Sequence, residues 1–236
     1  MQKIYVIIPA YNEEDAIGNV INDIPKIVSE VYVCDNGSTD KTVEKAKQAG
    51  AIVVSESEKG YGAACLKAMD LVYLRDPADN DIIVYLDGDY SDYPAELIQL
   101  VEPILKDDYD LVIGSRILGK RSGMAKQGSL LPQAIFGNWL STFLIRLIWR
   151  YDFTDLGPFR AVKIGSLKKM KMEDRNYGWT VEMQVKAAIL KMKCCEVPVS
   201  YRKRIGESKV TGTIYGSVKA GIKILYTIFY LLFIKF

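Results

Sequence analysis

Short apolar runs rich in β-branched residues alternate with helix-like segments through the first half of the chain. Residues 4–8, 31–34, 52–54, 82–86 and 111–113 are each short enough to be a buried strand. Between the first two runs, Ile17, Val20 and Ile21 recur at helical spacing after Asn12, the expected N-cap. This alternation predicts an α/β fold with a mostly parallel sheet covered by helices on both faces. Such sheets bind ligands at the carboxyl ends of their strands.

The second half of the chain has a different pattern. Residues 117–133 are rich in Gly, Ser, Lys and Arg, and we expect a long loop there. Apolar residues then recur at helical spacing over 136–148, and 178–191 is a second expected helix. We expect a strand at 196–201 and a basic loop at 201–209.

The last segment, 214–236, is expected to form a separate C-terminal helix after a domain spanning 1–213. Residues 224–234 lack charged side chains, but eleven residues are too few to span a bilayer, which needs about 20. Extending this segment towards the N-terminus includes Lys219 and Lys223, which favours a helix on a membrane surface with its lysines facing the lipid headgroups. The alternative is a terminal helix packed on the domain.

Composition excludes several classes of protein. The net charge of +2 supplies no basic field for nucleic acid, so we expect no nucleic-acid partner. The chain contains no histidine, which excludes a Ser-His-Asp triad and His-ligated zinc. Its four cysteines form no Cys-x-x-Cys pair, and no secretory signal precedes Pro9. We therefore expect a cytoplasmic protein.

Two acidic residues directly follow the apolar run 82–86. Asp87-Gly88-Asp89 would place both carboxylates at the ligand edge of the sheet, where they repel each other unless a cation lies between them. Mg²⁺ or Mn²⁺ held by one or two carboxylates and substrate phosphates fits this arrangement. The alternative is an acidic surface turn, since Asp-Gly is a common turn dipeptide.

Further polar residues follow other expected strands. Asp35 could accept hydrogen bonds from a nucleobase, whereas Ser38 to Asp40 are explained by helix capping. Tyr11 could stack on a base. Gly60-Tyr61-Gly62 lacks the spacing of a dinucleotide-binding loop or a P-loop, which excludes NAD enzymes and P-loop ATPases.

Together these motifs resemble glycosyltransferase family 2, of GT-A fold, close to the dolichyl-phosphate mannose and glucose synthases. The resemblance covers residues 4 to about 213 and rests on segments 7–14, 35–40, 60–64, 87–89, 114–116, 155–160, 178–183 and 204–209. The sequence departs from the family at Asn36, where a second Asp is common, and at Leu156-Gly157-Pro158, beside the acceptor side.

The resemblance implies a role for each matched residue. Substrate binding is expected of Pro9, Tyr11, Glu13, Asp35, Gly60, Asp87, Gly88, Arg160, Arg204, Ser208 and Lys209. Of these, Pro9, Tyr11, Glu13 and Asp35 would line the nucleotide pocket, and Arg204 with Lys209 would clamp a phosphate. Asp87 and Asp89 would bind the metal, and Asp89, Arg116, Asp155 and Glu182 are the expected catalytic residues.

The reaction implied by the resemblance is inverting transfer of a hexose from a nucleoside-diphosphate sugar. A polyprenyl phosphate acceptor is already anionic and needs no strong base, whereas a hydroxyl acceptor needs a carboxylate such as Asp155 or Glu182. Both residues also have structural interpretations: Asp155 could cap a turn, and Glu182 could pair with Arg204 or Lys209. A non-catalytic nucleotide-sugar-binding protein is the third possibility.

Three segments favour a lipid acceptor and peripheral attachment to the cytoplasmic face of a membrane. They are the stretch 136–150, the basic loop 202–204 and the C-terminal helix. The apolar stripe of 136–148 also has ordinary core spacing, so burial in the domain is the alternative. The sequence leaves the oligomeric state open.

Overall fold

The structure is a computed structural model that describes residues 2–124, 132–206 and 214–233. The elements are β1 (Ile4–Ala10), α1 (Ile17–Asn22), β2 (Glu30–Asp35), α2 (Thr42–Gln48), β3 (Ile52–Ser55), α3 (Tyr61–Tyr73), β4 (Ile82–Tyr85), η1 (Pro94–Glu96), α4 (Leu97–Asp107), β5 (Leu111–Ser115), α5 (Arg116–Arg121), α6 (Pro132–Trp149), β6 (Arg160–Lys163), α7 (Ile164–Met170), α8 (Trp179–Ile189), β7 (Cys194–Pro198) and α9 (Ile214–Phe233).

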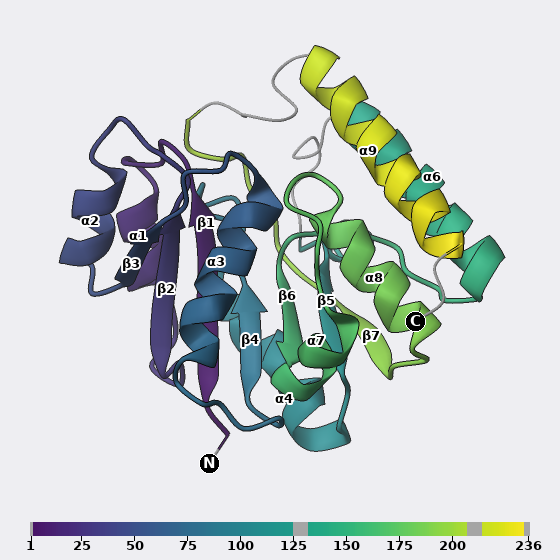
Figure 1. Ribbon diagram of the computed structural model, residues 1–236, viewed down its shortest axis with the longest axis horizontal. Coiled ribbons are helices and arrows are strands. Elements are labelled where there is room, and N and C mark those ends of the chain that lie inside the picture. The colour runs from purple at the N-terminus through teal and green to yellow at the C-terminus, as the bar shows by residue number, and fades with distance from the viewer. Residues whose placement is uncertain (1, 125–131, 207–213, 234–236) are drawn as a thin grey trace.

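Over the described residues, seven strands form one sheet in the order β3-β2-β1-β4-β6-β5-β7. β6 runs antiparallel to its neighbours β4 and β5, and the other pairs are parallel. The chain moves outward from β1 to β3 and then crosses to the other side of β1 to form β4 (Figure 1). Strand order therefore reverses beside β1, where sheets of this kind bind ligands.

Alternate residues of each strand enter two separate cores. Tyr5 and Ile7 of β1 face α3, α7 and α8 on one side of the sheet, whereas Val6 and Ile8 face α1, α2 and α4 on the other. This follows from the two-residue period of a strand, and it explains why the central strands are apolar at nearly every position. The α/β fold class is confirmed.

The five predicted strands of the first half are confirmed as β1 to β5. The expected N-cap was wrong: α1 begins at Ile17 after Ala16, and Asn12 instead has a φ of 53° in the preceding turn. The Asn12 side-chain oxygen accepts from the Thr39 backbone amide, and the Asn12 backbone amide donates to the Ser38 hydroxyl. Asn12 thus joins two loops at the ligand edge.

The second half contains elements that the sequence patterns did not reveal. The expected loop 117–133 overlaps α5, whose N-cap Ser115 accepts from the Leu118 amide, and α6 begins at Pro132. β6 was missed because it has only four residues and begins with an arginine. β7 begins two residues earlier than predicted, at Cys194, because it pairs in register with β5.

The C-terminal helix α9 packs against α6 and α8 (Figure 1). Its inner face buries Thr227, Ile228 and Leu231. Lys223 is 37% exposed and pairs with the buried Asp174 carboxylate at 2.8 Å, so this lysine is tied to the domain. That the lysines of this helix face lipid headgroups stays a prediction. Among the described helices, none is long and apolar enough to cross a membrane.

Candidate active site

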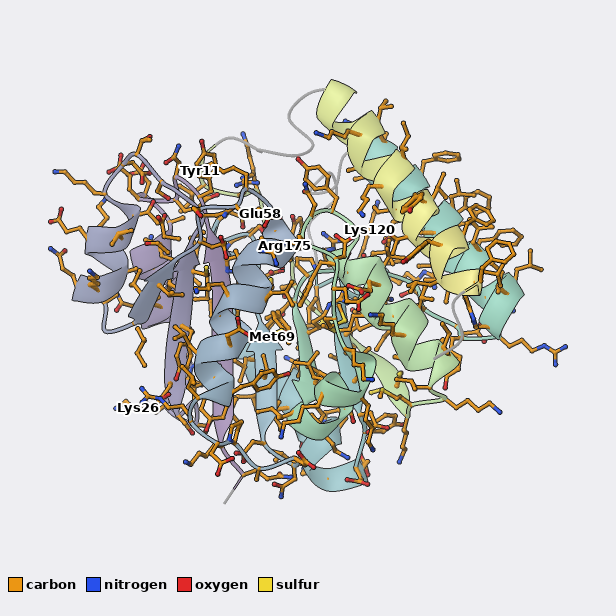
Figure 2. The ribbon with its side chains drawn as sticks, viewed as in Figure 1. Tyr11, Lys26, Glu58, Met69, Lys120 and Arg175 are labelled. Carbon is orange, nitrogen blue, oxygen red and sulfur yellow. The ribbon has the colours of Figure 1, made fainter. Side chains whose placement is uncertain are left out.

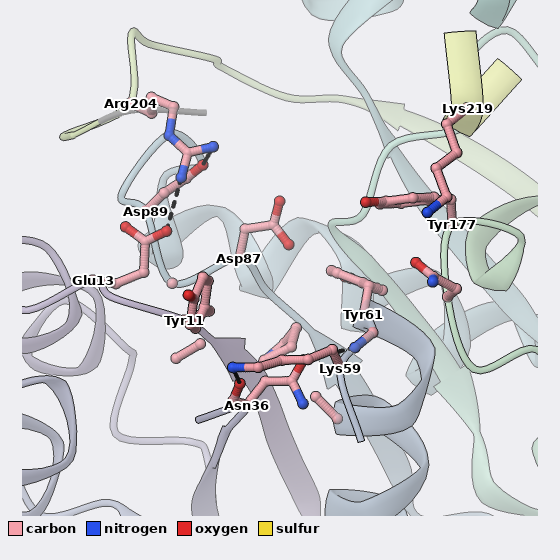
Figure 3. A pocket seen from close by; sticks show the side chains of 16 residues that line it. Tyr11, Glu13, Asn36, Lys59, Tyr61, Asp87, Asp89, Tyr177, Arg204 and Lys219 are labelled. Atoms are coloured by element: carbon pink, nitrogen blue, oxygen red, sulfur yellow. Dashed lines mark hydrogen bonds and ion pairs between the residues drawn. The ribbon is translucent and has the colours of Figure 1, made fainter. Parts of the chain in front are cut away.

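The carboxyl ends of β1, β2 and β4 border a pocket of about 390 Å³. Figure 3 shows the side chains that line it, which come from loops far apart in the sequence. Its lining is Pro9, Ala10, Tyr11, Glu13, Asn36, Lys59, Gly60, Tyr61, Ala64, Asp87, Gly88, Asp89, Asn176, Tyr177, Arg204 and Lys219. Eight predicted site residues therefore meet here: Pro9, Tyr11, Glu13, Gly60, Asp87, Gly88, Asp89 and Arg204.

One wall of the pocket is aromatic and cationic. Tyr11 is 37% exposed at the end of β1, and the Lys59 ammonium lies 4.3 Å from the centre of its ring. The same ammonium donates to the carbonyl oxygens of Asn36 and Gly37 at 2.7 and 3.1 Å. A flat, partly exposed ring beside fixed cationic and polar groups can stack on a planar ligand.

Asn36 holds this wall together. Its amide nitrogen donates to the Glu56 and Glu58 carbonyls at 3.1 and 2.7 Å, and its amide oxygen accepts from the Gly60 amide at 2.8 Å. An aspartate cannot donate these two hydrogen bonds, which explains why an asparagine suits this position. Asn36 therefore departs from the family pattern at a position where its side-chain amide holds the neighbouring loop.

Gly60 and Gly62 allow close approach of the loop between α7 and α8. A Cβ at Gly60 would lie 2.0 Å from the Arg175 carbonyl oxygen, and one at Gly62 would lie 1.9 Å from the Asp174 carbonyl oxygen. Arg175 further pairs with Glu58 at 2.7 Å, and Figure 2 shows these two side chains together near the ligand edge. Only glycine fits at both positions.

Asp87 and Asp89 follow β4 and line the pocket. Asp89 is 6% exposed, and its carboxylate accepts from the Ser91 amide at 2.8 Å. Burial, and next the neighbouring Asp89 carboxylate, raise the pKa of Asp87 to about 7. In the described part of the chain, no group of three or more acidic, His or Cys side chains is placed to hold a metal by itself.

Arg204 lies beside two of the carboxylates at this edge of the sheet. Its guanidinium pairs with Glu13 at 2.8 Å and with Asp89 at 3.2 Å. Two backbone hydrogen bonds place it there, from the Arg202 amide to the Ser91 carbonyl and from the Ile205 amide to the Asp89 carbonyl, both 3.0 Å. The expected basic loop is thus anchored to the turn that carries the two aspartates.

Two of the predicted catalytic residues bind each other outside the pocket lining. Asp155 is fully buried and accepts three hydrogen bonds from Arg116: 2.8 Å from its amide, 2.8 Å from Nε and 2.7 Å from Nη2. Burial acts to raise the pKa of Asp155, but Arg116 and its hydrogen bonds outweigh burial and lower it. The roles assigned to both residues stay predictions.

Three other predicted site residues also lie outside the lining. Arg160 is fully buried and donates to the Gly157, Leu156 and Thr180 carbonyls. Glu182 is buried and pairs with Lys186 at 2.7 Å, whereas Arg204, one of its two expected partners, pairs with Glu13 and Asp89 instead. The other expected partner, Lys209, lies outside the described residues. Asp35 accepts from the amides of the following turn, Gly37 and Ser38.

Ser208 and Lys209, the remaining predicted binding residues, lie outside the described residues. Conversely, sequence reasoning missed Lys59, Tyr61, Asn176, Tyr177 and Lys219 as pocket residues. Lys59 precedes the glycine motif, Tyr61 lies within it and Tyr177 precedes Gly178, so their positions in or beside motifs were a usable signal. No local pattern indicated that Lys219 would reach the pocket.

Known proteins resemble the chain along most of its length. The family model of glycosyl transferase family 2 matches residues 5–169. A dolichyl-phosphate hexose transferase of Haloferax volcanii is 31% identical over 208 residues, 87% of this chain and 85% of that protein. An undecaprenyl-phosphate mannosyltransferase of Micrococcus luteus is 27% identical over 237 residues, 93% of this chain and 92% of that protein.

The fold is also found among solved structures. Glucosyl-3-phosphoglycerate synthase from Mycobacterium tuberculosis, crystallised with Mn²⁺, UDP and glucosyl-3-phosphoglycerate, superposes with a TM-score of 0.74 at 20% identity. The match covers 100% of this chain and 81% of that one. The same enzyme was crystallised with Mg²⁺ and UDP, which supports use of a divalent metal by enzymes of this fold. The chain thus belongs to glycosyltransferase family 2 and has the GT-A fold.

Proposed function

We propose that this glycosyltransferase transfers a hexose from a nucleoside-diphosphate sugar to a polyprenyl phosphate, with inversion at the anomeric carbon. We choose a phosphate acceptor because the carboxylates in and near the pocket already have partners and are poorly placed to act as a base. Asp155 and Glu182 are both buried in ion pairs outside the pocket, Glu13 and Asp89 are paired with Arg204, and Asp87, which also lines the pocket, would bind the metal. A phosphate oxygen is already anionic, so attack on the sugar requires no base.

Asp87 and Asp89 would hold Mg²⁺ or Mn²⁺. Their carboxylate oxygens suit these hard cations, and a cation would relieve the repulsion that contributes to the raised pKa of Asp87. Since two carboxylates cannot complete a coordination shell, donor phosphates would supply further ligands. When bound, the metal stabilises the negative charge that develops on the departing diphosphate.

The donor would lie along the ends of β1 and β2. Tyr11 offers a face for the base, and Pro9 and Gly60 shape the wall beside it. Arg204 would neutralise the diphosphate, and its Nε is buried without a hydrogen-bond partner among the described residues, which leaves a donor for phosphate. During transfer the bond from the anomeric carbon to the diphosphate oxygen breaks while the acceptor oxygen bonds from the opposite face.

We further propose that the outer faces of α6 and α9 attach the protein to the cytoplasmic surface of a membrane. Large apolar side chains are exposed on α6 at Phe136, Trp139, Phe143 and Leu147, and on α9 at Val218, Ile222, Tyr226, Phe229, Tyr230 and Phe233. Arg150 is exposed directly after α6 and would meet anionic headgroups, and Arg146 on the last turn is also exposed but pairs with Asp152 at 2.9 Å. Exposed aromatic residues next to arginines are typical of helices that lie in the interface.

The relatives support the proposed acceptor, since two of them are named for transfer to dolichyl phosphate or undecaprenyl phosphate. The test is transfer of labelled sugar from UDP- and GDP-hexoses, with Mg²⁺ or Mn²⁺, to a short polyprenyl phosphate or to the matching polyprenol. We expect product with the phosphate only, and none from Asp89→Asn. Product with the alcohol would favour a hydroxyl acceptor, and nucleotide binding without transfer would favour a non-catalytic protein.

Membrane attachment is tested separately by flotation with vesicles that contain anionic lipid. The double variant Trp139→Asp and Phe143→Asp should lose vesicle binding, because it places charges on the exposed face of α6. Leu74→Asp is the matched control, since Leu74 is 80% exposed but lies at the end of α3. Equal flotation of all three proteins would contradict attachment through α6.

A further inference from the structure

The C-terminal helix contributes a lysine to the pocket that holds Asp87 and Asp89. Lys219 of α9 lines this pocket although it lies 130 residues after Asp89 in the chain. Figure 3 shows it beside Tyr177, on the side of the pocket opposite Arg204. The helix with the exposed apolar face therefore also borders the candidate active site.

Lys219 differs from the other cations of the pocket in its partners. Arg204 is held by Glu13 and Asp89, and Lys59 is held by two carbonyl oxygens and the ring of Tyr11. For Lys219, neither an ion pair nor a hydrogen bond is found within the described part of the chain. A lysine at a pocket wall with three free N–H donors is available to an anionic ligand.

The position of Lys219 is set by contacts that tie α9 to the pocket wall. One turn further along α9, Lys223 pairs with Asp174 at 2.8 Å. Asp174 also accepts from the amides of Asn176 and Gly178 at 2.8 and 3.1 Å. A Cβ at Gly178 would lie 2.5 Å from the Thr227 hydroxyl, so this loop packs tightly on α9.

The loop that holds α9 also supplies two of the pocket residues, Asn176 and Tyr177. On its other side it packs on Gly60 and Gly62, as described above. The pocket wall, the loop and α9 thus form one continuous set of close contacts. This explains how a residue of the last helix is held at a site built on the first strands.

We propose that Lys219 binds a phosphate group of a substrate, so that α9 completes the active site. The inference rests on the proposed function and names a binding residue that neither the motifs nor the family resemblance assign. The phosphate is either the diphosphate of the donor or the phosphate of the lipid acceptor. In both cases an anionic phosphate oxygen would accept a hydrogen bond from the Lys219 ammonium group.

The test compares Lys219→Met, which removes the charge, with Lys219→Arg, which keeps it. Lys106→Met is the control, since Lys106 pairs with Glu102 on the surface of α4, away from the pocket. Calorimetry with Mn²⁺ measures the affinity for UDP and GDP against that for uridine and guanosine. Steady-state transfer then measures KM for a short polyprenyl phosphate in detergent.

We expect Lys219→Met to weaken one phosphate ligand by about tenfold or more, whereas Lys219→Arg and Lys106→Met stay near wild type. A loss for UDP or GDP but not for the nucleosides identifies the donor diphosphate, and a raised KM alone identifies the acceptor phosphate. If the wild type binds and Lys219→Met matches it within twofold in both assays, the inference is overturned while the proposed function stands. If the wild type binds neither ligand, both fail.

Discussion

Replacement of Asp155 by alanine tests whether this residue is a buried structural partner of Arg116. The Asp155 carboxylate is 0% exposed, and the Arg116 side chain is 15% exposed. Asp155→Ala removes three hydrogen bonds of 2.7 to 2.8 Å and leaves the guanidinium without its counter-charge. Removal of one partner of a buried ion pair costs about 3–5 kcal/mol.

We expect a value near the lower end, about 3 kcal/mol in the free energy of unfolding, because Arg116 keeps some contact with water. For a domain of this size, each kcal/mol lowers Tm by about 2–4 °C, so Asp155→Ala should melt roughly 6–12 °C below wild type. Urea denaturation followed by circular dichroism measures the free energy, and calorimetry measures Tm.

A double variant separates loss of the pair from exposure of an uncompensated charge. Arg116→Met combined with Asp155→Leu removes both charges, so it should be more stable than Asp155→Ala alone. If Asp155→Ala costs less than about 1 kcal/mol, or if the double variant is the less stable of the two, the assignment of a buried structural pair is refuted.

The pH dependence of the same pair follows from the lowered pKa of Asp155. The folded protein keeps this carboxyl ionised below its ordinary pKa of about 3.9. Its contribution to the free energy of unfolding is therefore fully present above that pH. The contribution is lost as the pH falls through the lower, folded pKa. The difference in unfolding free energy between wild type and Asp155→Asn should stay constant from about pH 5 to 8 and shrink below about pH 4.

Three further predictions follow from packing and burial. Gly62→Ala should lower the free energy of unfolding by about 1–3 kcal/mol and weaken UDP binding, because its Cβ would lie 1.9 Å from a backbone oxygen. Gly18→Ala is the control, since its Cβ would meet nothing within 4 Å and the variant should be neutral or stabilising. Urea denaturation measures the stability of both variants, and calorimetry measures their affinity for UDP. Burial raises the pKa of Cys34 to about 12, so iodoacetamide at pH 8 should leave this thiol unmodified until urea unfolds the chain, as peptide mass spectrometry would show. Lys186→Met should cost about 3–5 kcal/mol in urea denaturation because it leaves the buried Glu182 carboxylate unpaired, and a cost below about 1 kcal/mol would contradict a buried pair.

Much of the fold and half of the site could be predicted from local patterns. The β-branched runs predict β1 to β5, and residues directly after parallel strands must meet at one edge of the sheet. This is why Tyr11, Asp87 and Asp89, which all follow expected strands, line one pocket. The family motifs added Gly60 and Arg204, which local pattern alone could not assign.

Polar pairing across the fold could not be predicted in the same way. Asp155 and Glu182 both stood in recognisable motifs, but a motif does not say which cation lies opposite a carboxylate. Asp155 meets Arg116, 39 residues earlier, and Glu182 meets Lys186 on its own helix. The first pair depends on how distant segments are brought together in the fold, whereas the second is an i,i+4 pair within α8 that helical spacing alone allows.

The sequence by itself determined the α/β architecture and the acidic pair at the sheet edge, because the strand and helix periods and the residues that end each strand are local properties. Only the tertiary structure decided which charged side chains form ion pairs between distant segments, as Asp155 does with Arg116, and which face the pocket. Lys219 shows the difference, since its place depends on contacts of α9 with a loop about 45 residues earlier in the chain. The position of such a residue is set by long-range packing, and it cannot be predicted from the local periodicity of the sequence.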